Sequence, residues 1–171
     1  KNNSLVILDY AHTPDALKTC LSDLREQFSD KKINIVFGCG GDRDKNKRSK
    51  MGSIASSLCS KVYLTDDNPR YENPKKIRMK VKKHISSRKV IEIPERKLAI
   101  SRAIENLQSD ELLIVAGKGH EKVQDYGKRK FFFSDRSIIK KSINKRNKKL
   151  SSNIKVNILN EYADKKILKY S

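Results

Sequence analysis

Four short polar clusters contain the residues of this sequence that could bind a ligand. Each combines glycine or proline with charged or ring-bearing side chains, and they are Tyr10–Pro14, Gly38–Asp44, Asp66–Arg70 and Gly117–Glu121. Each cluster directly follows an apolar, β-branched run, so each is expected to be the loop that leaves a strand. In an open parallel α/β sheet the loops at the carboxyl ends of the strands share one rim, where ligands bind. The sequence therefore predicts one composite site, and its residue types suit an anionic ligand.

The glycine-rich cluster Gly38–Asp44 could hold a phosphate or a carboxylate. Glycines let backbone N–H groups approach an anion closely, and Arg43 adds a permanent positive charge. The Gly-Lys-Ser/Thr ending of a P-loop is absent, and so is the GxGxxG pattern of dinucleotide-binding folds. A tight turn that needs glycine for its own geometry is the alternative interpretation of this cluster taken alone.

Two other clusters supply a guanidinium and a carboxylate. Pro69 stiffens the loop from which Arg70 projects, and a guanidinium binds carboxylates through two parallel hydrogen bonds, as lysine cannot. In the last cluster Gly117 permits close approach of a ligand, and Glu121 could accept from an ammonium group. Taken singly, these are equally consistent with surface turns and strand-ending glycines, and His12 with an ordinary loop histidine. Their joint occurrence favours a site.

Strands alternate with helical segments along most of the chain, which predicts a Rossmann-like doubly wound α/β fold with a mostly parallel sheet and an edge hairpin. Thr13, Asn73 and Ser134 are predicted helix N-caps, the first two followed by proline at the first helical position. The expected strands are Ser4–Leu8, Ile33–Phe37, Lys61–Thr65, Val90–Ile93 and Leu112–Ala116, and the expected hairpin strands are Val123–Tyr126 and Lys130–Phe133. The expected helices begin near Thr13, Ser49, Asn73, Ala99 and Asp135.

The composition of the chain limits the kinds of partner, bound metal and cellular location that can be expected. Lys+Arg number 39 against Asp+Glu 20, a net charge of +19, which raises a polyanion-binding alternative. The lysines are dispersed and only Lys140–Lys149 is a dense basic block, which favours a solvated surface and no nucleic-acid partner. The three cysteines lack metal-site or disulfide spacing, and we predict no bound metal. No apolar stretch reaches the length of a membrane span and no signal peptide is evident, so a cytoplasmic location without membrane insertion is expected.

The domain organisation is predicted as one domain over residues 1–150, followed by a different segment over residues 151–171. That segment carries short apolar alternations and is interpreted as a tail, a linker or the start of a further domain. Because the first residue is Lys1, we expect the chain to be a piece of a longer protein.

Read together and in order, the four clusters resemble the C-terminal domain of the Mur ligases, in particular the subtype that adds meso-diaminopimelate. The resemblance runs from about Ser4 to Leu150. It implies an ATP-dependent acid–amino-acid ligase of peptidoglycan synthesis that phosphorylates the D-glutamate carboxylate of a UDP-MurNAc-dipeptide to an acyl phosphate, which the incoming amine attacks. ATP and Mg²⁺ would be held mainly by a central ATPase domain, and the uridine nucleotide by an N-terminal domain.

The resemblance also implies roles for individual residues. The diaminopimelate pocket would comprise Arg43, Asp67, Asn68, Pro69, Arg70, Gly117 and Glu121. Tyr10 and His12 would face the nucleotide, and no catalytic residue is assigned in this chain. Without a phosphate loop the chain is expected to be inactive alone. Three departures from the family pattern leave the charged positions intact: Asn46 for glycine, Asn73 for aspartate and Val123 for an aromatic residue.

The sequence is also consistent with two alternative functions. One is another member of the same ligase superfamily, such as a folylpolyglutamate or cyanophycin synthetase, against which the clusters at Asp67–Arg70 and Gly117–Glu121 argue. The other is a standalone basic domain that binds polyanions.

Overall fold

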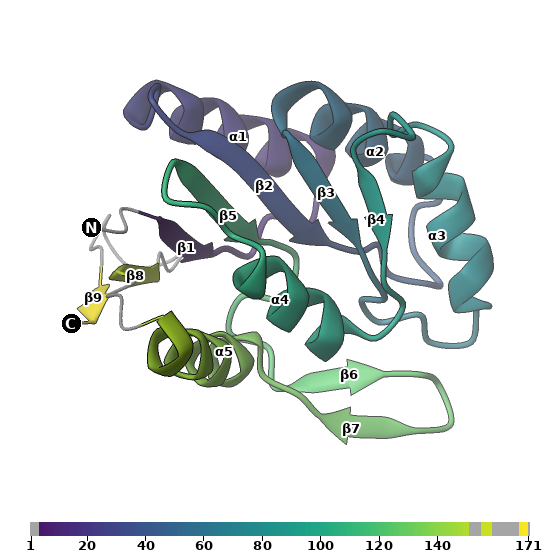
Figure 1. Ribbon diagram of the computed structural model, residues 1–171. Coiled ribbons are helices and arrows are strands. Elements are labelled where there is room, and N and C mark those ends of the chain that lie inside the picture. The colour runs from purple at the N-terminus through teal and green to yellow at the C-terminus, as the bar shows by residue number, and fades with distance from the viewer. Residues whose placement is uncertain (1–3, 151–154, 159–167, 171) are drawn as a thin grey trace.

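A computed structural model of the chain describes residues 4–150, 155–158 and 168–170. Its centre is a parallel sheet in the order β4-β3-β2-β5-β1 (Figure 1). These strands are β1 (Leu5–Leu8), β2 (Lys32–Phe37), β3 (Lys61–Leu64), β4 (Val90–Glu92) and β5 (Glu111–Val115). The predicted mostly parallel α/β sheet is therefore confirmed.

Strand order decides where the four predicted loops lie. β5 returns to the middle of the sheet and pairs with β2 on one side and β1 on the other, so β3, β2, β5 and β1 are consecutive neighbours. The four polar clusters follow these four strands. The position where the chain reverses its direction of winding is also where open α/β sheets bind ligands.

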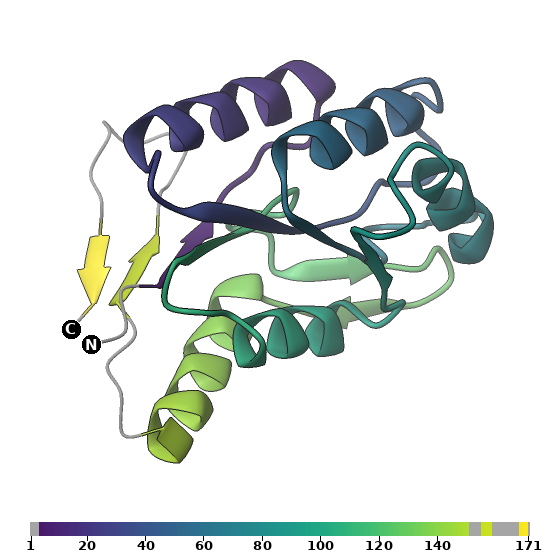
Figure 2. The ribbon, with the colours of Figure 1, turned by 45° about the horizontal axis from the view of Figure 1, so that its top comes forward.

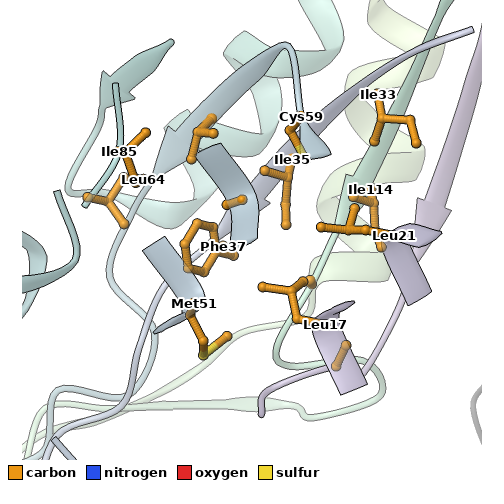
Figure 3. Packing of buried hydrophobic residues seen from close by; sticks show 14 of the residues in the cluster. Leu17, Leu21, Ile33, Ile35, Phe37, Met51, Cys59, Leu64, Ile85 and Ile114 are labelled. Carbon is orange, nitrogen blue, oxygen red and sulfur yellow. The ribbon is translucent and has the colours of Figure 1, made fainter. Parts of the chain in front are cut away.

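Helices cover both faces of the sheet (Figure 2). On one face lie α1 (Pro14–Gln27), α2 (Lys47–Leu58) and α3 (Pro74–Lys82), and on the other lie α4 (Arg96–Glu105) and α5 (Asp135–Leu150). Leu17 and Leu21 of α1 and Met51 of α2 pack on Ile35 and Phe37 of β2 (Figure 3). β2 and β5 are buried on both faces, as the continuous apolar runs of a parallel sheet require.

The predicted N-caps are confirmed. Thr13 Oγ1 accepts from the backbone N–H of Ala16 at 3.3 Å, and Asn73 Oδ1 accepts from that of Lys76 at 3.2 Å. Ser134 Oγ likewise accepts from the N–H of Ser137 at 3.3 Å. Asn46 precedes α2 with a right-handed backbone, φ −71°, so this asparagine does not need the left-handed conformation that a glycine would supply.

The predicted hairpin forms as β6 (Val123–Asp125) and β7 (Lys130–Phe132), but it is a two-stranded sheet of its own rather than an extension of the main sheet. It packs instead against the loop after β3. Gln124 Nε2 donates to the carbonyl of Asp67 at 2.9 Å, and the Arg70 N–H donates to the carbonyl of Asp125 at 3.0 Å.

Two short strands are described after α5. β8 (Lys155–Ile158) pairs in parallel with β1, and β9 (Leu168–Tyr170) pairs antiparallel with β8. The proposed boundary near residue 151, and the rest of the segment that follows it, lie outside the described residues. None of the described helices combines the length and apolar character needed to cross a membrane.

Candidate functional site

The four loops line one open cavity of about 580 Å³. It lies at the carboxyl ends of the central strands and reaches the N-terminal ends of α1 and α2. Its lining residues come from all four clusters and from the start of α2: Tyr10, His12, Thr13, Pro14, Gly38, Gly40, Arg43, Asp44, Lys47, Asp67, Asn68, Arg70, Gly117 and Glu121. Residues more than 100 positions apart in the sequence therefore share one ligand-sized space, as the sequence predicts.

The loop after β2 lies directly on the loop after β3. A Cβ on Gly41 would collide with the carbonyl of Pro69, so only glycine allows this approach. The Gly41 N–H donates to the carbonyl of Asn68 at 2.9 Å. Asp42 has a φ of 50° and its carboxylate accepts from the N–H of Tyr71 at 3.1 Å. Arg43 follows this turn as an exposed side chain on the cavity.

Arg70 has a left-handed backbone, with φ 50°. A non-glycine residue pays a steric cost for this conformation, which recurs at functional sites. Here it turns the side chain back over the loop after β2, where Nη1 donates to the carbonyl of Gly41 at 2.7 Å. The half-buried guanidinium is thereby held at the cavity.

Asn68 and Glu121 form a connected polar pair on the cavity. Asn68 Nδ2 donates to Glu121 Oε2 at 3.1 Å, although the two residues follow different strands. The Glu121 side chain is 35% exposed. A carboxylate held on one oxygen and partly open to solvent can accept from a ligand ammonium on the other.

Asp67 lies between the cavity and a buried charge cluster. Arg96 is fully buried and forms two hydrogen bonds with the buried carboxylate of Asp135, at 2.9 and 2.7 Å. Its Nη1 lies 3.9 Å from Asp67 Oδ2. Burial alone would lower the pKa of Arg96, but the charge and hydrogen bonds of Asp135, together with the charges of Asp67 and Glu121, outweigh burial and the pKa is raised. A permanent cation therefore stands behind Asp67.

Three rings gather at the outer edge of the cavity. The Tyr10 ring stacks on His120 with centroids 5.5 Å apart and meets His12 edge-on at 4.7 Å. Lys47 Nζ donates to the carbonyl of His12 at 2.9 Å, which joins the loop after β1 to the start of α2. Tyr10 is half-buried and His12 is exposed, so this group lies nearer the surface than Asn68.

Of the predicted site residues, all but one line the cavity. Pro69 is buried beneath the loop after β2, so its contribution is to shape the loop and not to contact a ligand. Cys39 lies in the glycine-rich loop, but burial raises its pKa to about 12, so its thiol stays protonated. The described residues contain no group of three or more His, Cys, Asp or Glu side chains placed to hold a metal ion.

Two buried cations beside the cavity, Arg48 and Lys118, have no role predicted from the sequence. Arg48 is 1% exposed and Lys118 is 0% exposed, and both form hydrogen bonds to residues of the loops. The available signal for Lys118 was a charged residue between two glycines, directly after a buried strand. Nothing in the pattern around Arg48 distinguishes it from neighbouring surface residues of α2.

Comparisons with known proteins agree with this geometry. A family model described as Mur ligase, glutamate ligase domain, matches residues 1–119. A UDP-N-acetylmuramoyl-L-alanyl-D-glutamate–2,6-diaminopimelate ligase of Rickettsia felis is 46% identical over 147 residues, 85% of this chain and 28% of the relative. The ligase of the same name from Buchnera aphidicola is 49% identical over 150 residues, 85% of this chain and 29% of the relative.

Solved structures extend the comparison. One of a ligase with that name has a TM-score of 0.79 and 38% identity, covering 86% of this chain and 30% of the other. A folylpolyglutamate synthase/dihydrofolate synthase from Yersinia pestis, at 20% identity and a TM-score of 0.54 over 66% of this chain and 25% of the other, shares the fold alone. The chain spans less than a third of the length of the curated relatives described above. With most of its length matched by the family model and its four loops lining one cavity, the chain belongs to the Mur ligase family.

Proposed function

We propose that this chain is the amino-acid-binding domain of an ATP-dependent ligase that adds meso-diaminopimelate to UDP-N-acetylmuramoyl-L-alanyl-D-glutamate in peptidoglycan precursor synthesis. The observation that carries the proposal is that the guanidinium groups of Arg43 and Arg70 and the carboxylate of Glu121 line one cavity. The names of the similar ligases support this choice of amino acid.

The charges of the cavity complement those of diaminopimelate. The distal end of this amino acid carries a carboxylate and an ammonium group, whereas lysine carries only the ammonium. Arg70 would bind the distal carboxylate through its fork of N–H donors, and Glu121 would accept from the ammonium. Lysine would leave the half-buried Arg70 without its ligand partner, which is unfavourable.

The remaining steps of the reaction would use parts of a longer protein. ATP would phosphorylate the D-glutamate carboxylate in a central ATPase domain, where Mg²⁺ would neutralise charge on the phosphates. An N-terminal domain would hold the uridine nucleotide, and Tyr10 and His12 would face the nucleotide from this chain. The task of the cavity is to hold the incoming amine in position, so that its attack on the acyl phosphate is effectively intramolecular. Since both ATP and the nucleotide-linked precursor are cytoplasmic metabolites, we place the reaction in the cytoplasm.

Titration of the ¹⁵N-labelled 171-residue chain with meso-diaminopimelate, followed by NMR, tests the proposal. The backbone amides of Gly40, Asn68 and Gly117 should shift, while those of Ile143 and Arg146, in the second half of α5 on the other face of the sheet, should not. L-Lysine, the matched control, should bind at least about ten-fold more weakly because it forms no charged contact with Arg70. Equal binding of the two amino acids, or shifts confined to other surfaces, would refute the proposed specificity.

A further inference from the structure

Lys118 is a fully buried lysine directly behind the cavity. It is 0% exposed and is not among the residues that line the space. Its ammonium donates to Asn68 Oδ1 at 2.7 Å, to the carbonyl of Val123 at 2.8 Å and to Glu121 Oε2 at 3.2 Å. A lysine ammonium has three N–H donors, so these contacts use all of them.

These contacts fix which end of the Asn68 amide faces which neighbour. Asn68 Oδ1 accepts from the Lys118 ammonium and, at 3.0 Å, from the backbone N–H of Asp125. Both groups can only donate, so the oxygen must face them. The Nδ2 group must then face Glu121, to which it donates at 3.1 Å. A flipped amide would direct its oxygen at the Glu121 carboxylate and its N–H group at two donors.

From this geometry we infer that Lys118 is a positioning residue that sets the polarity of the amino-acid pocket. Together with the Asp125 N–H, it makes Asn68 a donor on the side of Glu121, and it holds one Glu121 oxygen so that the other is available to a ligand ammonium. It does this without touching the ligand. The inference rests on the proposed function, because it names the residue that prepares the pocket for a zwitterionic amino acid.

Because the Lys118 ammonium is buried, its partners Asn68 and Glu121 are held in place. A buried cation is tolerated only when it is paired and its hydrogen bonds are satisfied. Two of the three partners of Lys118 are cavity residues, and the third, Val123, begins the hairpin that packs on the loop after β3. Displacement of Asn68 or Glu121 would leave one N–H donor of the buried Lys118 ammonium without an acceptor. Such a displacement is therefore energetically unfavourable.

The test compares Lys118→Met with the unaltered chain, since methionine has a similar length and no N–H donor. The Kd for meso-diaminopimelate should rise about ten-fold or more, the effect of losing a hydrogen bond to a charged group. In an Asn68→Ala background the same substitution should have a smaller effect, because one of the two cavity residues through which Lys118 acts is already gone. An unchanged Kd, or equal effects in both backgrounds, would overturn the inference.

Arg146→Met is the matched control. Arg146 is also a buried cation, and it donates to the carbonyls of Ile104 and Leu107 between α4 and α5, away from the cavity. Its replacement should lower the thermal midpoint while leaving the Kd unchanged. Equal weakening of binding by both substitutions would mean that Lys118 serves stability alone, and would overturn the inference.

A measurement on the unaltered chain covers the case in which Lys118→Met does not fold. The buried Lys118 ammonium should give its own ¹H–¹⁵N signal, because its protons exchange slowly with water, and meso-diaminopimelate should shift that signal. A stationary Lys118 signal while the Gly40 and Gly117 amides shift would refute the role of Lys118 and leave the proposed function intact. No shift at any of these positions would refute the proposed function itself.

Discussion

The Arg48 guanidinium donates to both oxygens of the Glu72 carboxylate, at 2.8 and 3.1 Å, and so joins the start of α2 to the loop after β3. Arg48 also donates to the carbonyl of Gly40 at 3.1 Å, and Glu72 accepts from the Asp42 N–H at 2.7 Å. The Arg48–Glu72 ion pair thus helps to hold the loop after β2 against the loop after β3, beside the cavity.

The Arg48–Glu72 pair should make stability depend on pH at the acidic end. The hydrogen bonds from Arg48 and the Asp42 N–H lower the pKa of Glu72 from 4.5 to about 2. The pKa of Glu72 is lower in the folded chain than in the unfolded chain. The stabilisation from the ion pair is therefore fully present above pH 4.5, the pKa in the unfolded chain, and is lost as the pH falls from 4.5 toward 2. Glu72→Gln should therefore lower the free energy of unfolding at pH 6 but have little effect at pH 2. Urea denaturation between pH 2 and pH 6 measures the change in the free energy of unfolding, with Glu26→Gln on α1 as control. A change that is the same at every pH would contradict the prediction.

Arg70→Ala should weaken binding of meso-diaminopimelate by about ten-fold to more than a hundred-fold, since a charge-assisted contact contributes roughly 1.5–3 kcal/mol. Isothermal titration calorimetry of the two chains measures the change. Arg102→Ala, which removes an exposed guanidinium from α4, is the control and should leave the Kd unchanged. If the Arg70→Ala chain bound meso-diaminopimelate as tightly as the unaltered chain, Arg70 would not be a ligand-binding residue.

Gly117→Ala should destabilise the chain by more than about 1 kcal/mol, because its φ of 109° is strained for any residue with a side chain. The new Cβ would also lie 3.0 Å from Asp67 Oδ2, so binding of the amino acid should weaken as well. Chemical denaturation and ligand titration measure the two effects, with Ser53→Ala on the exposed face of α2 as control. A Gly117→Ala chain as stable as the parent would show that the loop relaxes into an ordinary conformation.

The 171-residue chain alone should not release phosphate from ATP in the presence of meso-diaminopimelate and the UDP-linked dipeptide. Phosphoryl transfer requires residues that position the phosphates and Mg²⁺, and the sequence has no Gly-Lys-Ser/Thr phosphate loop. A phosphate-release assay at high chain concentration, with an intact ligase of the family as positive control, checks this. Turnover by the chain would contradict it.

Local chemistry in the sequence determined the elements of the fold. Thr13 and Asn73 were identifiable as N-caps because each precedes a proline and an apolar helical pattern, and both caps form as expected. The buried strands were identifiable as β-branched runs. The hairpin strands were also identifiable, but their lack of pairing with the main sheet was not, since sequence alternation does not specify a partner strand.

The residue types of the candidate site were likewise determined by the sequence, whereas their combination was decided by the tertiary structure. Arg43, Arg70 and Glu121 stand in three separate loops, and they share a cavity because β5 inserts between β2 and β1. The roles of Arg48 and Lys118 emerge only in three dimensions. Their partners Glu72 and Asn68 lie 24 and 50 residues away along the chain, and a buried cation is defined by partners that only folding assembles.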